Sequence, residues 1–172
     1  MENTNMKKMN QLGLAVLAAT TFSTSAMAFD AQCASTDEAA VASLFDRWNS
    51  SLKTHDSDKV VANYADDAVL LPTVSNKPRT NHEEIKDYFN SFLKKDPSGV
   101  IDRRIIKIGC NIAQDVGTYT FTFKGGQKVS ARYTFVYEYK DGDWLIAHHH
   151  SSAMPEKAVA HKKVSHRFHK LH

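Results

Sequence analysis

Apolar residues recur at helical spacing in the first part of the chain. Steps of three and four residues join one stripe, which indicates a long amphipathic helix, with Val41, Leu44, Phe45, Trp48 and Leu52 as its members. Ser35 and Glu38 have the spacing of a capping box, so we expect this helix to begin directly after Ser35. A second, short helix should open at Ser57.

A short strand and a third helix come next. The apolar run at 68–72 is typical of a brief strand that ends at Pro72. Asn81 can cap the third helix. Its inner face would consist of Ile85, Tyr88, Phe89, Phe92 and Leu93.

From Val100 onward the apolar period changes to two, as in half-buried strands. The alternation predicts four strands, at 100–110, 114–124, 128–139 and 143–150. Turn-forming residues separate them, and Asp141-Gly142 is a strong hairpin signal. Together the elements predict one α+β domain over residues 29–156, with three helices packed on a curved antiparallel sheet.

The two ends of the chain differ from this domain. Residues 1–28 combine a basic start, a short apolar run and Ala26-Met27-Ala28, the pattern of a cleaved signal peptide. We therefore expect a periplasmic or secreted protein that has no membrane contact after cleavage. The apolar run has about half of the roughly 20 residues that a membrane span needs.

The positive charge of the chain is confined to its C-terminal tail. The net charge is +3, yet residues 157–172 hold five Lys or Arg residues and no acidic one, so the remainder is net negative. We expect a flexible, basic, His-rich tail and no nucleic-acid partner. Its histidines suggest one alternative role, capture of metal ions, which deletion of 157–172 should abolish.

Cys33 and Cys110 are the only cysteines. In an oxidising compartment an even pair favours a disulfide, here between the segment before the first helix and a central strand. Two separate buried thiols remain the alternative, because sequence alone does not give the geometry.

Two segments indicate a family. "YADDAVLLP" after the second helix and "YKDGDWLIAHHHSSAMP" at the end resemble the NTF2-like superfamily, and most of all the association (hub) domain of calcium/calmodulin-dependent protein kinase II and its free-standing bacterial relatives. The resemblance covers about residues 36–156. It implies an NTF2-like (cystatin-like) cone with an internal pocket and a homodimer, or higher even oligomer, formed through the open sheet face.

The resemblance does not imply a kinase. A Gly-rich phosphate loop, a His-Arg-Asp catalytic loop and an Asp-Phe-Gly motif are all missing from the sequence. The core also lacks a basic amphipathic helix, so calmodulin is not expected as a partner. The expected partners are other copies of the chain and a small organic ligand, and no cofactor is expected.

The three consecutive histidines near the C-terminus are the main candidates for a site. If 143–150 is one regular strand, His148 and His150 share the face of Trp144 and Ile146, and His149 takes the other face. Two such imidazoles can approach a metal, but the sequence shows no third ligand at the spacing of a known metal-binding motif, so no metal is predicted. The predicted pocket residues are Trp48, Tyr64, Arg132, His148 and His150.

Arg132 has a second interpretation, as an outward-facing strand residue. In the kinase hub domains, strand arginines hold acidic ligands, and the positions that we align with them are here Phe121, Phe135 and Ser151. Binding of acidic ligands is therefore not carried over from the resemblance.

An enzyme is the competing hypothesis for function. The fold also hosts ketosteroid-isomerase-like enzymes, but the acid position aligns here with Trp48 and the base position falls in 70–72, which contains no carboxylate. The remaining candidates are Asp67 with His148 or His150, as the acid and base of a cofactor-free isomerase, lyase or hydrolase. Asp66 and Asp67 have a structural interpretation as well, as polar residues at a helix end or turn.

Overall fold

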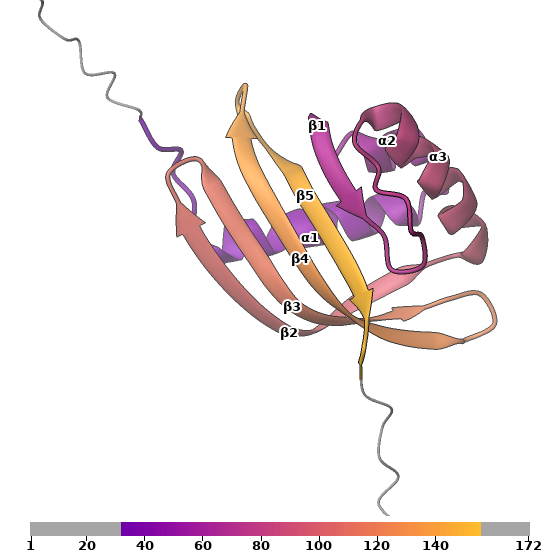
Figure 1. Ribbon diagram of the computed structural model, residues 1–172. Coiled ribbons are helices and arrows are strands. Elements are labelled where there is room, and N and C mark those ends of the chain that lie inside the picture. The colour runs from indigo at the N-terminus through magenta and orange to yellow at the C-terminus, as the bar shows by residue number, and fades with distance from the viewer. Residues whose placement is uncertain (1–31, 156–172) are drawn as a thin grey trace, which may run out of the picture. The chain divides into compact units, whose positions relative to one another are not determined.

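The computed structural model describes residues 32–155 (Figure 1). The signal peptide and the basic tail predicted above lie outside these residues. Five strands form one sheet in the order β1-β5-β4-β3-β2. The strands are β1 (Tyr64–Leu71), β2 (Ser98–Gly109), β3 (Ile112–Thr122), β4 (Lys128–Lys140) and β5 (Asp143–Ala153). Within 32–155 no helix combines the length and the apolar character that a membrane crossing requires.

Three α-helices accompany the sheet, as expected. They are α1 (Glu38–Leu52), α2 (Ser57–Val61) and α3 (His82–Phe92), and the short 3₁₀ helix η1 (Leu93–Lys95) extends α3. Asn81 caps α3, as predicted. The predicted cap of α1 is wrong: Asp37 is the N-cap, because its Oδ1 accepts the Ala40 N–H at 2.7 Å.

The predicted α+β class is confirmed, with one departure in the sheet. Strands β2 to β5 form an antiparallel meander, whereas β1 pairs parallel to β5. The β4–β5 turn is the predicted hairpin, in which Asp141 and Gly142 have φ of 51° and 93°.

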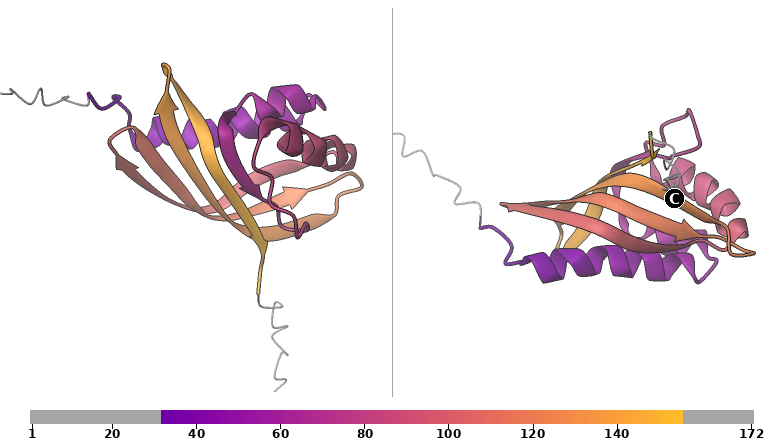
Figure 2. Two further views of the ribbon diagram at one scale, coloured as in Figure 1. Left: turned by 45° about the horizontal axis from the view of Figure 1, so that its top comes forward. Right: turned by 90° about the horizontal axis from the view of Figure 1, so that it is seen from below.

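Strong curvature enters the sheet at β2. The β2–β3 register shifts between Ile101 and Arg103, as at a β-bulge. Opposite the shift a Cβ on Gly117 would come within 1.9 Å of the Arg103 carbonyl oxygen, so only glycine fits. The sheet curls around the helices, and its other face remains open (Figures 1 and 2).

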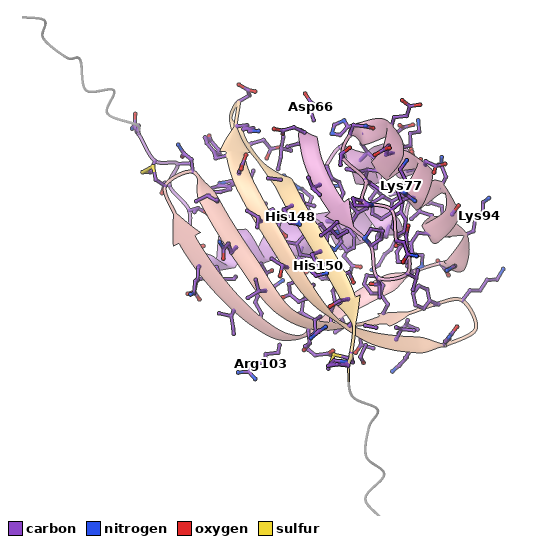
Figure 3. All side chains as sticks on the ribbon, viewed as in Figure 1. Asp66, Lys77, Lys94, Arg103, His148 and His150 are labelled. Atoms are coloured by element: carbon purple, nitrogen blue, oxygen red, sulfur yellow. A yellow bond between two sulfur atoms is a disulfide. The ribbon has the colours of Figure 1, made fainter. Side chains whose placement is uncertain are left out.

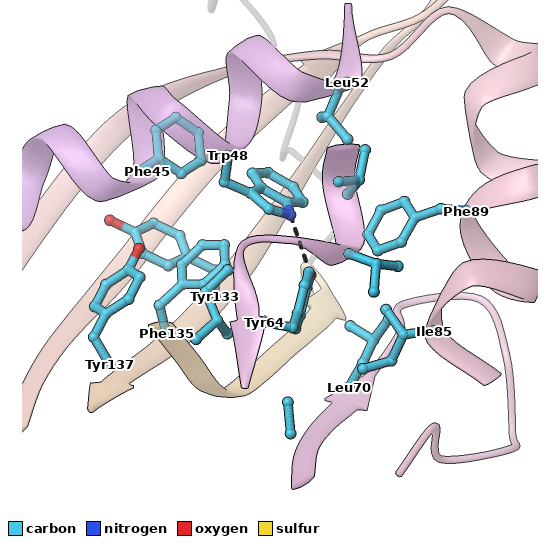
Figure 4. Close-up of a cluster of buried hydrophobic side chains, with 14 of the residues drawn as sticks. Phe45, Trp48, Leu52, Tyr64, Leu70, Ile85, Phe89, Tyr133, Phe135 and Tyr137 are labelled. Carbon is cyan, nitrogen blue, oxygen red and sulfur yellow. Dashed lines mark hydrogen bonds between the residues drawn. The ribbon is translucent and has the colours of Figure 1, made fainter. Parts of the chain in front are cut away.

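The core fills the concave face. Aromatic rings from α1, α3 and the inward strand positions dominate it (Figure 4). Trp48 touches rings on several elements, with Phe89 of α3 at 6.3 Å and Phe135 of β4 at 5.4 Å between ring centroids. One continuous aromatic cluster thus joins the helices to the sheet.

The predicted disulfide is confirmed. Cys33 and Cys110 are bonded, with Cα atoms 4.8 Å apart. Cys110 lies in the β2–β3 turn at the sheet edge, not in a central strand. The Ala34 N–H donates to Asn111 Oδ1 at 2.7 Å, which adds a second contact between the two segments.

Candidate ligand-binding cavity

One additional residue in β5 decides which histidines face the core. Tyr137 of β4 pairs with Ile146, but the next position, Val136, pairs with His148, so Ala147 has no partner of its own. Such a bulge inverts the alternation beyond it. Ile146 therefore points inward as predicted, but after the bulge the inward residues are His149 and Ser151.

The predicted orientation of the histidines is therefore wrong. His148 and His150 lie on the open face of the sheet, where Figure 3 labels them. Arg132 is also on this face, because it pairs with Ser152 and its Nε donates to Ser152 Oγ at 3.2 Å. The outward interpretation of Arg132 is the correct one, and none of these three side chains lines the cavity described below.

A hydrogen-bonded chain joins α1, β1 and β5 inside the core. Trp48 Nε1 is 3.1 Å from Tyr64 Oη, drawn as a dashed line in Figure 4, and Tyr64 Oη is 2.9 Å from His149 Nδ1. The indole N–H can only donate, so the Tyr64 oxygen accepts this hydrogen bond. The buried Tyr64 hydroxyl has His149 Nδ1 as its only acceptor among the described residues, so we assign Tyr64 Oη–H as the donor to Nδ1.

This chain determines the protonation state of His149. Burial, with smaller contributions from His148 and His150, lowers the pKa of His149 to about 3, so the ring is neutral at physiological pH. Because Nδ1 accepts a hydrogen bond, the single ring proton is on Nε2. Burial also raises the pKa of Tyr64, which keeps its hydroxyl protonated.

His149 is held among aromatic rings. It stacks on Phe135 with centroids 4.0 Å apart and meets Trp48 edge-on at 5.2 Å. Only 4% of the residue is exposed. Its Nε2 has no hydrogen-bond partner among the residues that the structure describes. The ring therefore offers one buried donor that nothing in 32–155 uses.

A cavity of about 530 Å³ opens beside this ring. Its wall is formed by α1, α3, η1, the loop after β1, the β3–β4 turn and the inner face of the sheet. The lining residues are Trp48, Leu70, Pro72, Thr73, Val74, Tyr88, Phe89, Phe92, Lys95, Tyr119, Phe121, Phe123, Lys124, Gln127, Val129, Ala131, His149 and Ser151. Trp48 lines it, whereas Tyr64 lies behind the wall and acts through its hydrogen bonds. The lining contains no carboxylate, and its two lysines are exposed.

Three hydroxyl groups form a second polar spot on the wall. Tyr119 Oη donates to Ser151 Oγ at 2.6 Å, and Ser151 shares a short hydrogen bond with Thr73 Oγ1. Two hydrogen bonds use two of the three protons, so one hydroxyl of the Ser151–Thr73 pair can donate further. The sequence analysis did not predict this spot, because it considered Ser151 only as the position aligned with a strand arginine of the kinase hub domains.

The two aspartates of "ADDA" are remote from the cavity. Both lie in β1 rather than at a helix end, and both are exposed. Asp67 pairs with Lys140 at 3.2 Å, which lowers the pKa of Asp67. Asp67, His148 and His150 all lie outside the cavity, so the acid–base hypothesis built on them is wrong as stated. The described residues contain no cluster of three or more metal-ligating side chains.

A buried ion pair marks the other end of the core. Asp115 has a fully buried carboxylate, with Arg104 Nε at 3.0 Å and the Tyr133 hydroxyl donating at 2.7 Å. Burial raises the pKa of Asp115, and its contacts with Tyr133 and Arg104 oppose the rise. The strand alternation could have revealed this residue, because Asp115 shares the inward parity of Ala113 and Tyr119.

The comparisons with known proteins agree with this geometry. The family model described as calcium/calmodulin dependent protein kinase II association domain matches residues 37–155. The chain belongs to this association-domain family. A Xanthomonas campestris protein assigned to the same domain has a crystal structure with 51% sequence identity and a TM-score of 0.67, over 73% of this chain and 96% of that one. No curated protein matches significantly.

More distant structures extend the likeness of fold beyond the association-domain family. A cystatin-like protein from Nostoc punctiforme has 17% identity and a TM-score of 0.62, over 75% of this chain and 99% of that one. An NTF2-like protein from Pseudomonas putida has 17% identity and a TM-score of 0.63, over 72% and 90%. The predicted NTF2-like architecture is therefore confirmed.

Proposed function

We propose that this protein is a self-associating module that pairs through the open face of its sheet and holds a small organic molecule in its cavity. The observation that carries the first part is a row of side chains across all five strands of the open face. Paired positions in the sheet give its members, Ile105, Val116, Thr134, His150 and Leu71. The name of the association-domain family supports self-association as the common property.

The open face has the character of a contact surface. Ile105 is 49% exposed although it stands on a regular strand beside Val116, and no helix within 32–155 covers this side (Figure 2). Ile105, Val116 and Leu71 thus place exposed or partly exposed apolar side chains on one rigid sheet face, which favours burial against a second copy. His150 and Thr134 add hydrogen-bonding groups, which suits an interface that is polar in part.

Sedimentation velocity tests this proposal. The wild-type protein should sediment as an even-numbered assembly, and Ile105→Asp should shift it to the monomer because a carboxylate would be buried without a partner. Val74→Asp is the matched control, since Val74 is exposed but lies on the cavity side. A wild-type monomer at all concentrations, or an Ile105→Asp variant that assembles normally, would contradict the proposal.

The cavity supports the second part. Its volume of about 530 Å³ lies in the range of small-molecule sites, and aromatic side chains with a few polar groups line it. Native mass spectrometry of the protein isolated from its own host tests this role. Extra organic mass on the wild type, lost when Ala131→Trp fills the cavity, is the expected result. If both proteins show only the mass of their own polypeptide, with no bound molecule, the cavity function is contradicted.

We also propose that the protein works outside the cytoplasm. The Cys33–Cys110 disulfide supports this location, because such bonds persist in oxidising compartments. The signal-peptide pattern of residues 1–28 supports it as well. Cell fractionation with thiol-trapping reagents should find the oxidised protein, shortened at its N-terminus, in the periplasm or medium. Full-length, reduced protein in the cytoplasm would reject the location.

A further inference from the structure

We infer that the cavity takes an uncharged, flat ring compound whose carbonyl oxygen accepts a hydrogen bond from His149 Nε2–H. This inference rests on the proposed cavity function and names its ligand class. Three properties of the cavity wall carry it: the unpartnered Nε2–H assigned to His149, the absence of buried charge, and the aromatic rings of the lining.

The donor follows from the hydrogen-bonded chain inside the core. Trp48 donates to Tyr64 and Tyr64 donates to His149 Nδ1, so Nε2 carries the proton. Nε2 is buried and has no partner among the described residues, although the ring lies on the cavity wall. A buried donor without a partner carries a desolvation cost. A ligand oxygen that accepts this proton would remove that cost.

The missing charge restricts the acceptor to a neutral group. The lining contains no Asp or Glu, and its only formal charges belong to Lys95 and Lys124, whose exposed side chains reach water. A carboxylate deep in the cavity would lose its hydration without gaining a buried cation. A carbonyl oxygen accepts the same hydrogen bond at a much smaller desolvation cost.

The walls determine the shape of the ligand. Tyr119 and Phe121 meet at 4.9 Å, and Phe92 meets Phe121 at 5.8 Å, so ring faces and edges surround the space. Flat rings stack on such surfaces more favourably than flexible chains. The spare hydroxyl proton of the Ser151–Thr73 pair offers a second donor, two positions along β5 from His149. A ring compound with one or two carbonyl oxygens matches this set.

Three naphthalenes of nearly equal size test the inference: 2-acetylnaphthalene, 2-isopropenylnaphthalene and 2-naphthoate. They present a neutral acceptor, no acceptor and a charged acceptor. Titration calorimetry gives their affinities for the wild type and for His149→Phe. We expect 2-acetylnaphthalene to bind tightest to the wild type. In His149→Phe the preference for it over 2-isopropenylnaphthalene should fall about tenfold. His55→Asn, an exposed histidine outside the cavity, is the matched control and should keep the preference.

The other outcomes separate two kinds of failure. Equal affinities for the acetyl and isopropenyl compounds would overturn the inference and leave the cavity function standing. Tightest binding of 2-naphthoate would overturn it too, and would point to the lysines at the entrance. If none of the three binds the wild type, the inference and the proposed cavity function both fail.

A measurement on the wild type covers the case in which His149→Phe does not fold. In protein labelled with nitrogen-15 at histidine, the His149 ring should show a proton on Nε2 and none on Nδ1. Addition of 2-acetylnaphthalene should shift the Nε2–H signal, and 2-isopropenylnaphthalene should leave it nearly unchanged. A proton on Nδ1, or equal shifts with both compounds, would overturn the inference.

Discussion

His149 lies almost parallel to Phe135, with ring centroids 4.0 Å apart and 23° between the planes. This stacking holds a neutral imidazole inside an aromatic cluster, with one nitrogen hydrogen-bonded to Tyr64 and the other without a partner among residues 32–155. Both the stability of the core and the chemistry of the cavity depend on the ring staying neutral. Its titration is therefore the most direct test of the structure.

We expect the protein to lose stability on mild acidification. The unfolded chain protonates His149 near pH 6.5, whereas the folded protein resists protonation until about pH 3. Between these values the unfolded state binds more protons, so stability rises with pH in this window and falls as the pH decreases. The contribution of one residue approaches 1.4 kcal/mol for each pH unit, in order of magnitude.

Urea unfolding between pH 4 and 7, at one protein concentration, measures this slope. His149→Phe should lose the part that His149 contributes, and His150→Gln, on the open face, should keep it. An unchanged slope in His149→Phe would show that the ring is not held neutral in the native state.

Gly117 should tolerate no side chain. An alanine Cβ would collide with the Arg103 carbonyl oxygen at 1.9 Å, and backbone on a neighbouring strand has no easy way to move. Gly117→Ala should therefore cost about 3 kcal/mol of unfolding free energy. Gly125→Ala is a useful comparison, since it has open space but a φ of +84°, and should cost about 1 kcal/mol. Thermal unfolding that ranks Gly125→Ala as the more harmful change would be incompatible with the β2–β3 register.

The Cys33–Cys110 bond should account for a large part of the stability. It closes a loop with a sequence separation of 77 residues, and a loop of this size restricts the unfolded chain by roughly 4 kcal/mol on the chain-entropy model. The double variant Cys33→Ser/Cys110→Ser should unfold at a correspondingly lower urea concentration. Reductant should bring the wild type to the same midpoint and leave the double variant unaffected. If reductant lowers the unfolding midpoint of both proteins, its effect does not come from the Cys33–Cys110 bond, and the prediction fails.

Removing one partner of the Arg104–Asp115 pair should reduce the unfolding free energy more than replacing both partners by apolar residues. Asp115→Asn leaves the guanidinium without its buried countercharge, so we expect a loss of about 3 kcal/mol in unfolding free energy. The double variant Arg104→Met/Asp115→Leu removes both charges and should lose less. Equilibrium unfolding of Arg104→Met, Asp115→Leu and the double variant gives the coupling energy. Strictly additive losses would mean that the two side chains do not interact.

Local patterns in the sequence were sufficient to predict most elements of the fold. The apolar stripe through Trp48 located α1, Asn81 located the start of α3, and Asp141-Gly142 located the last hairpin. The cap of α1 was misplaced because Ser35 and Asp37 are both good caps, and which of them meets the helix depends on how the preceding segment approaches.

The candidate site was harder to predict, for a physical reason. Strand alternation holds only while every residue has a partner, and no glycine or proline marks Ala147 as the residue without one. The same limit applied to Arg132, whose face became clear only from its pairing with Ser152. Register is a property of two strands together, so one strand read alone does not contain it.

The bulge at Ala147 decides which of the three consecutive histidines is buried. One imidazole is enclosed with the aromatic rings, and the two beside it face whatever the sheet meets. Under the function proposed above, substitutions of His148 or His150 should affect assembly and leave ligand binding beside His149 unchanged. Deleting Ala147 should leave these assignments unchanged, because Ile146 and His148 already pair with the adjacent positions Tyr137 and Val136. Only a strand in which Ala147 itself paired with Val136 would turn His149 outward and the other two histidines inward.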